Sequence, residues 1–191
     1  MPSVAVGSLT FTFPNGWSVN QLDEWAYYRR QFLDLGNNVR MVCNRCSVQL
    51  RCKECNTAKI ASMRCCDLVA IGTNTAWLIE VKDYRQQRRT KAIDLPDEIA
   101  LKIRDSLAVL LGAKMRANEA VEKTFAANTV ACSDLRVVLH LEQPVTDSKL
   151  FPRAIDPSKV LQRLKQIVKA IDPHPVVAEI NEMHNLPWTV S

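Results

Sequence analysis

Two apolar runs separated by a short turn constrain the fold of this chain more than any other feature. Residues 66–72 and 76–82 are rich in aliphatic side chains, and Gly72-Thr73-Asn74-Thr75 lies between them. Short apolar runs on either side of a glycine-containing turn are typical of two antiparallel strands. We therefore expect a hairpin inside a sheet.

Charged residues occur only at the shared end of this hairpin. Because strand side chains alternate between faces, Glu80 and Lys82 share one face and Ile79 lies on the opposite, buried face. Asp67, at the start of the first strand, comes beside Glu80. Two close carboxylates repel unless a cation lies between them, and their oxygens favour a hard ion such as Mg²⁺ or Mn²⁺. The arrangement predicts metal-assisted attack of water on a phosphodiester, with the lysine helping.

The spacing of these residues resembles that of a known family. Asp67, twelve residues and then Glu80-Val81-Lys82 are similar to the motif of the PD-(D/E)xK nuclease superfamily, which has the restriction-endonuclease-like fold. Within it, the chain resembles Holliday-junction resolvases and restriction-type endonucleases over roughly residues 17–142. The residue before Asp67 is a cysteine and not the proline of the family name.

The resemblance implies a Mg²⁺-dependent deoxyribonuclease. Asp67 and Glu80 would hold Mg²⁺ (or Mn²⁺) with the carbonyl of Val81, and Lys82 would assist the nucleophile. The alternative is that Glu80 and Lys82 form only a solvated cross-strand pair.

A further acid is implied by the same resemblance. Many members add one from their first helix, and Glu24 is the candidate here, with Asp23 as the second choice. The alternative for Glu24 is an ordinary solvated helix residue.

Basic residues follow the hairpin directly and could hold phosphates that flank the site. A solvated loop is the alternative. The residues expected to bind DNA are Arg85, Arg88, Arg89 and Lys91. A second basic group on the long helix that follows is expected to form its solvent face: Lys102, Arg104, Lys114 and Arg116.

Two CxxC pairs precede the hairpin. Four thiolates match the ligand count of a closed tetrahedral zinc site, although only five residues separate the pairs. An iron–sulfur cluster and free thiols are the alternatives, and the neighbouring Cys65 and Cys66 could replace a ligand. The candidate zinc ligands are Cys43, Cys46, Cys52 and Cys55.

The remaining patterns place the hairpin in a larger α/β domain. A strand is expected at 8–13, helices at 18–36, 96–126 and 156–171, and strands at 135–141 and in PHPVVAEINEM, with an irregular tail. The prediction is one domain, residues 1–191, with a central mixed β-sheet flanked by helices. It has a restriction-endonuclease-like core at about 17–142, a Cys-rich insert at about 40–57 and a C-terminal helix and strand in 143–191.

Composition narrows the function classes. The net charge of +5 permits an anionic partner, for which we expect DNA. No apolar run approaches the ~20 residues of a membrane span, and the N-terminus lacks the features of a secretory signal. The odd count of seven cysteines fits a reducing compartment. We therefore expect a cytoplasmic protein. The resemblance is also compatible with a homodimer, because many nucleases of this kind dimerise to cut two strands.

Two other functions are compatible with the sequence. One is a catalytically inactive, zinc-braced nucleic-acid-binding or assembly protein of the same fold. The other is a protein-interaction module.

Overall fold

The computed structural model describes residues 1–30, 64–87, 89–144 and 154–191. The strands are β1 (Ser3–Val6), β2 (Leu9–Thr12), β3 (Ser18–Asn20), β4 (Leu68–Gly72), β5 (Thr75–Asp83), β6 (Asp134–Glu142), β7 (Val176–Ala178) and β8 (Thr189–Val190). The helices are the 3-10 turn η1 (Leu22–Glu24), α1 (Ala26–Tyr28), α3 (Leu95–Arg116), α4 (Ala120–Ala131) and α5 (Pro157–Ile167). Within the described ranges, no helix is long and apolar enough to cross a membrane.

The predicted hairpin forms the centre of a five-stranded sheet in the order β3-β4-β5-β6-β7. β4 and β5 pair antiparallel, with Leu68 opposite Ile79. Thr73 and Asn74 in the turn both have positive φ, at 51° and 63°, as a tight hairpin turn requires. β6 and β7 then continue the sheet in parallel, so the sheet is mixed as predicted.

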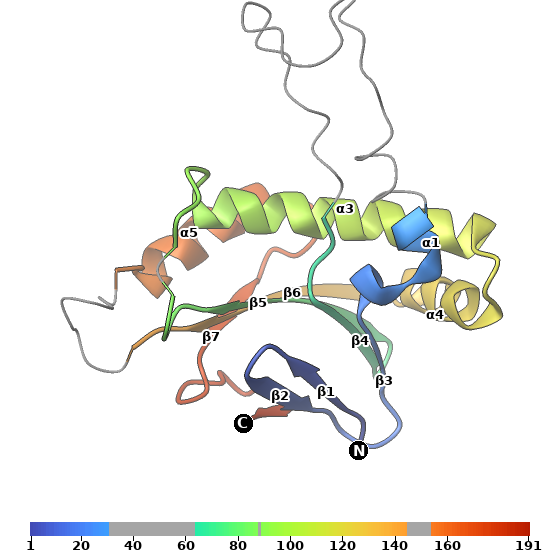
Figure 1. Ribbon diagram of the computed structural model, residues 1–191, viewed down its shortest axis with the longest axis horizontal. Coiled ribbons are helices and arrows are strands. Elements are labelled where there is room, and N and C mark those ends of the chain that lie inside the picture. Colours follow the sequence, from blue (N-terminus) through green and yellow to red (C-terminus); the bar gives the residue numbers. More distant parts are fainter. Residues whose placement is uncertain (31–63, 88, 145–153) are drawn as a thin grey trace, which may run out of the picture.

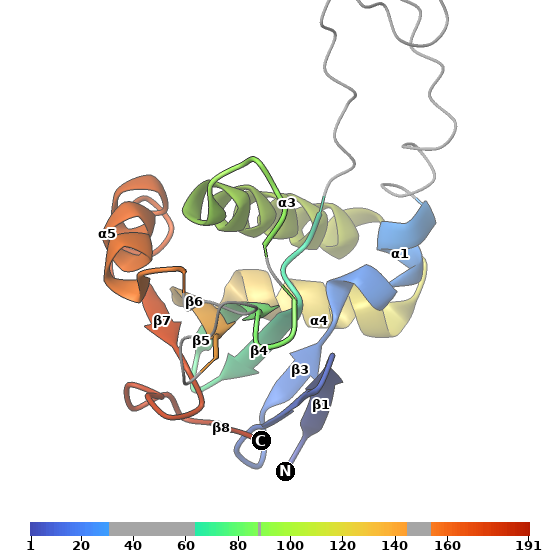
Figure 2. The same cartoon turned by 60° about the vertical axis from the view of Figure 1, so that its left-hand side comes forward.

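The molecule has three layers (Figure 1 and Figure 2). The helices cover one face of the main sheet, where Leu78, Ile103 and Leu139 belong to one buried cluster. A second, three-stranded sheet in the order β1-β2-β8 covers the other face, where Phe11 and Ile79 are buried. The structure is therefore α/β with helices beside a mixed central sheet. The smaller sheet on the opposite face was not foreseen.

The end of β4 packs closely against an aromatic residue. A side-chain carbon added at Gly72 would overlap the indole ring of Trp17. Trp17 in turn packs against Phe13 and Trp77, with ring centroids 6.0 and 6.3 Å away. Glycine at this position therefore allows Trp17 to cover the end of the sheet.

Three predicted elements were wrong in detail. Residues 18–20 are strand β3 and not the start of a helix, because their backbone pairs with the free edge of β4. The long helix expected at 96–126 is two helices, α3 and α4. A single helix of that length would span roughly 46 Å at ~1.5 Å per residue, whereas the turn brings Phe125 back into the core. The tail expected to be irregular contains β8.

Candidate functional site

A cluster of buried charges lies between the main sheet and α3. Glu80 and Lys82 are on the same face of β5 and form an ion pair, as their spacing indicates. That face is not open to solvent, because α3 covers it and the Glu80 side chain is 0% exposed. Asp67 lies next to them and its Oδ2 accepts a hydrogen bond from the backbone N–H of Val81 at 2.7 Å. The structure therefore brings together the acids and the lysine of the predicted motif.

Lys102 of α3 completes this cluster. Its Nζ lies 2.6 Å from Glu80 Oε1 and 3.5 Å from Asp67 Oδ1. The expectation that Lys102 belongs to the solvent face of the helix was wrong, since its side chain is 13% exposed. An ammonium group thus occupies the position between the carboxylates where the sequence placed a metal ion.

The charges in this cluster depend strongly on one another. Burial opposes the charge on Lys102, but the carboxylates of Glu80 and Asp67 outweigh it and raise the pKa of this lysine. Burial and the Asp67 carboxylate raise the pKa of Glu80, whereas the ammonium groups of Lys102 and Lys82 act against that rise. The carboxylate of Glu80 is therefore stable in the interior only while its cations are in place.

The two acids predicted from the first helix lie in η1. Glu24 is exposed, and its side chain has no hydrogen bond or ion pair with the described residues. Asp23, the second choice, is the one that interacts with the cluster. Partial desolvation and the Asp67 carboxylate raise its pKa. The catalytic role of Glu24 stays a prediction.

The basic loop after β5 is held by carboxylates. Arg89 Nη1 lies 2.7 Å from Glu98 Oε2, and Lys91 also pairs with Glu98. Burial opposes ionisation of Glu98, but these two partners lower its pKa to about 2. Arg85 pairs with Asp83 at 2.7 Å, and its hydrogen bonds lower the pKa of Asp83 to about 2. Arg88 lies outside the described residues. That this loop binds DNA stays a prediction.

The four cysteines of the predicted zinc site, Cys43, Cys46, Cys52 and Cys55, lie outside the described residues. Cys65 and Cys66 are buried in the core, and burial raises the pKa of the Cys65 thiol to about 12. Among the described residues no group of three or more His, Cys, Asp or Glu side chains could hold a metal ion.

His140 is buried in β6, on the side of the smaller sheet. Its ring packs edge-on against Phe11, with centroids 5.2 Å apart. Its Nε2 lies 2.9 Å from Glu142 Oε1, and Glu142 also accepts a hydrogen bond from the N–H of Ile180 at 2.7 Å. Burial lowers the pKa of His140, although Glu142 acts against this.

This histidine should make the protein less stable in mild acid. Below pH ~6.5 the unfolded chain binds a proton at His140 that the folded chain does not, so the free energy of unfolding should fall by at most about 1.4 kcal/mol per pH unit. Urea unfolding between pH 7.5 and 5.5 measures this slope. A His140→Gln variant should have a smaller slope, because it lacks the group that takes up this proton on unfolding. His174 and His184 are present in both proteins and so do not contribute to the difference. Equal slopes would contradict the assignment.

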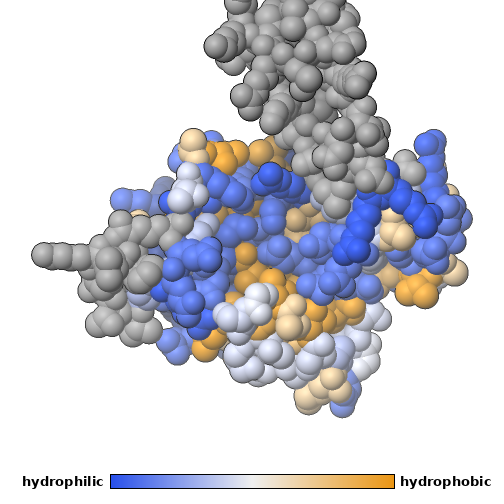
Figure 3. Space-filling model, viewed as in Figure 1, coloured by the Kyte–Doolittle hydropathy of each residue, from blue (hydrophilic) through white to orange (hydrophobic). Residues whose placement is uncertain are grey.

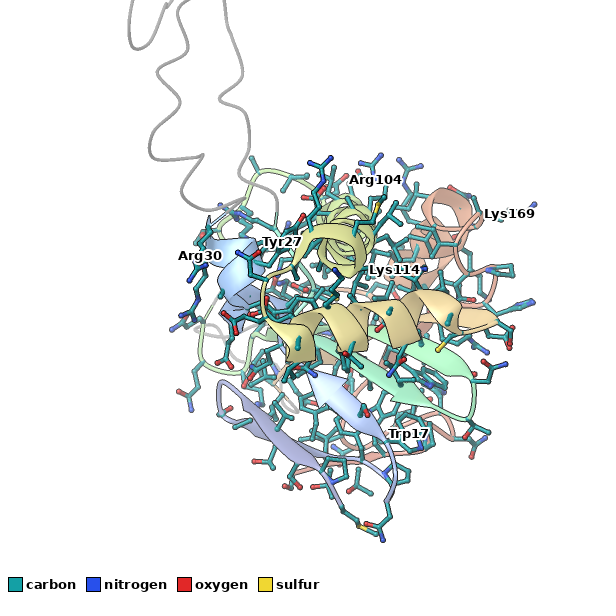
Figure 4. All side chains as sticks on the ribbon, turned by 90° about the vertical axis from the view of Figure 1, so that its right-hand side faces the viewer. Trp17, Tyr27, Arg30, Arg104, Lys114 and Lys169 are labelled. Atoms are coloured by element: carbon teal, nitrogen blue, oxygen red, sulfur yellow. The ribbon has the colours of Figure 1, made fainter. Side chains whose placement is uncertain are left out.

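Another group of cations lies on the helical layer and is free. Each is exposed and forms no ion pair with any described residue. Figure 4 shows Arg104, Lys114 and Lys169 on the side of the helices, and Trp17 on the side of the smaller sheet. The free cations on α3, on α4 and at the C-terminal end of α5 are Arg104, Lys114, Arg116, Lys123, Lys165 and Lys169. The sequence indicated the exposure of those on α3, but not which basic residues are paired.

The chain is similar to a tRNA ligase. It is 31% identical to the cysteine–tRNA ligase of Neisseria meningitidis serogroup A / serotype 4A (strain DSM 15465 / Z2491) over an alignment of 213 residues. The match covers 100% of this chain and 30% of the relative, so the chain spans less than a third of the relative's length. No family model and no solved structure matches the chain.

This similarity contradicts the predicted deoxyribonuclease. The relative that matches along the whole chain is named as a ligase, so the predicted activity of a Mg²⁺-dependent nuclease or hydrolase was wrong. The geometry offers a physical reason. The ammonium groups of Lys102 and Lys82 together balance the carboxylates of Asp67 and Glu80 from within the protein, so their proximity does not require a metal ion.

Proposed function

We propose that this chain is a tRNA-binding domain that holds the phosphate backbone of the RNA on its helical layer. The observation that carries the proposal is the uneven distribution of free cations. RNA has one negative charge per nucleotide, and unpaired lysine and arginine side chains on one face of a protein are the usual means of binding it.

The layer of the smaller sheet differs from the helical layer in its charge. Residues 1–28 and 170–191, which provide all three of its strands, contain no lysine or arginine. The second of these segments contains Asp172, Glu179 and Glu182. Figure 3 likewise shows hydrophilic side chains over the helices and the loop before α3, and values near neutral over the smaller sheet. A polyanion is therefore attracted to the helical side.

The similarity to a cysteine–tRNA ligase supports tRNA as the nucleic acid. Because the chain spans 30% of that relative, we propose binding of tRNA and not the ligase reaction. Mg²⁺ would enter as a counterion of the RNA. Structural zinc at the four cysteines of the CxxC pairs is part of the same proposal, since a closed site of this kind braces a domain without taking part in a reaction.

Binding should be salt-dependent and should need the free cations. We expect a Lys114→Gln variant to bind tRNA more weakly and to reduce the slope of log K against log[salt] by roughly 1, the effect of losing one phosphate contact. Fluorescence anisotropy with labelled tRNA at several salt concentrations measures both quantities.

The matched control is Lys91→Gln, which removes the same charge from a lysine already paired with Glu98. It should leave the slope unchanged. Equal effects of the two variants would show that net charge alone matters, and an absence of salt-sensitive binding would refute the proposal.

A further inference from the structure

Exposed apolar side chains lie among the free cations on the solvent side of α3. Residues three or four apart lie on one face of a helix. The α3 row, as we call it, follows this spacing and consists of Leu101, Arg104, Ala108, Leu111 and Met115. Its large apolar members are well exposed, with Leu101 at 41%, Leu111 at 53% and Met115 at 67%. Apolar side chains gathered on one face in this way usually mark a binding surface.

The charges beside the row indicate the nature of the partner. Arg104 lies within the row, and Lys114 and Arg116 are its neighbours on α3; none of them pairs with a described carboxylate. A second copy of this chain is disfavoured, because a two-fold interface through α3 would bring these cations against the same cations of the other copy. An anionic ligand with apolar faces of its own suits the row better.

We infer that the α3 row contacts unpaired nucleotides of the bound RNA, an inference that rests on the proposed tRNA-binding function. In an RNA duplex the faces of the bases are stacked on one another, and the outside presents phosphates and sugars. In a loop or single strand the base faces are free to cover apolar side chains while cations hold the phosphates on either side. Leu111 and Met115 next to Lys114 provide both kinds of contact.

The test compares RNAs that differ only in pairing. The full chain is titrated with a labelled hairpin that has a large loop, with an unstructured single strand and with a blunt duplex, all with the same number of phosphates. The hairpin and single strand should bind about tenfold more tightly than the duplex, the gain expected from covering roughly one aliphatic side chain. A Leu111→Ser/Met115→Ser variant should lose this preference and keep its affinity for the duplex.

Val130→Ser serves as the matched control, because Val130 is a similarly exposed apolar residue (40%) on α4, outside the row. It should leave the preference intact. Equal affinity of the unmodified chain for all three RNAs would overturn the inference while leaving tRNA binding in place. The inference would also be overturned if the double variant kept the preference for unpaired RNA. It would be overturned likewise if the unmodified chain self-associated and the double variant did not. Absence of binding to any RNA would refute the proposed function itself.

Discussion

Replacing Lys102 by methionine should lower the free energy of unfolding by about 3–5 kcal/mol, the usual cost of removing one partner from a buried ion pair. Methionine keeps most of the side-chain volume, so the loss is electrostatic. Without this ammonium group, Glu80 stays fully buried and Asp67 lies beside it with one cation fewer. Urea unfolding at pH 7, followed by circular dichroism, measures the effect.

Arg104→Met is the control for this variant. It also removes a cation from α3, but one that is exposed and has no described carboxylate partner. We expect a change within about 0.5 kcal/mol, as for most surface substitutions. Adding Glu80→Gln to Lys102→Met should restore part of the stability, because the unpaired charge is removed with its partner. A loss below about 1 kcal/mol in the single variant would show that Lys82 alone can hold Glu80.

Gly72→Ala should destabilise the protein by about 1–3 kcal/mol, the range found for overpacked cores. The added methyl group would overlap the indole ring of Trp17, and this ring cannot move freely because it packs against Phe13 and Trp77. Thermal and urea unfolding of the variant measure the cost. Trp17→Leu in the same chain should relieve the overlap, so the double variant should be more stable than the two single effects predict.

Gly112→Ala provides the comparison for that experiment. The new methyl group there would meet the hydroxyl tip of Tyr27, the end of a longer side chain, and alanine also favours the helix by about 1 kcal/mol over glycine. Its cost should therefore be smaller than that of Gly72→Ala. Strict additivity of Gly72→Ala and Trp17→Leu would show that the ring does not limit the space at Gly72.

The sequence predicted the central hairpin because its signals are local. The alternation along β5 placed Glu80 and Lys82 on one face, and the turn residues set the pairing that brings Asp67 beside them. The contribution of Lys102 could not be predicted in the same way. The helical pattern around Lys102 shows which residues share a face of α3. It does not show that this face packs against a buried carboxylate on a strand distant in the sequence.

The division of the basic residues into paired and free ones also depends on the fold. Arg89 and Lys91 look as available for a phosphate as Lys114 does in the sequence. Only the packing of α3 brings Glu98 within reach of the first two. The predicted DNA contacts were placed in the loop on the basis of neighbours along the chain, whereas the free cations of the helical layer come from three separate helices and the turn after α5.

The pairing of β2 with β8 has a consequence for how the chain folds. Phe11 is opposite Val190, so this sheet joins residues from nearly opposite ends of the sequence. Contacts between such distant segments form slowly. During synthesis, β2 cannot pair with β8 until residues 189–190 have been added to the chain. Until then the face of the main sheet around Leu68, Ile79 and Val138 lacks part of its cover, and its exposed apolar surface can recruit chaperones or other nascent chains.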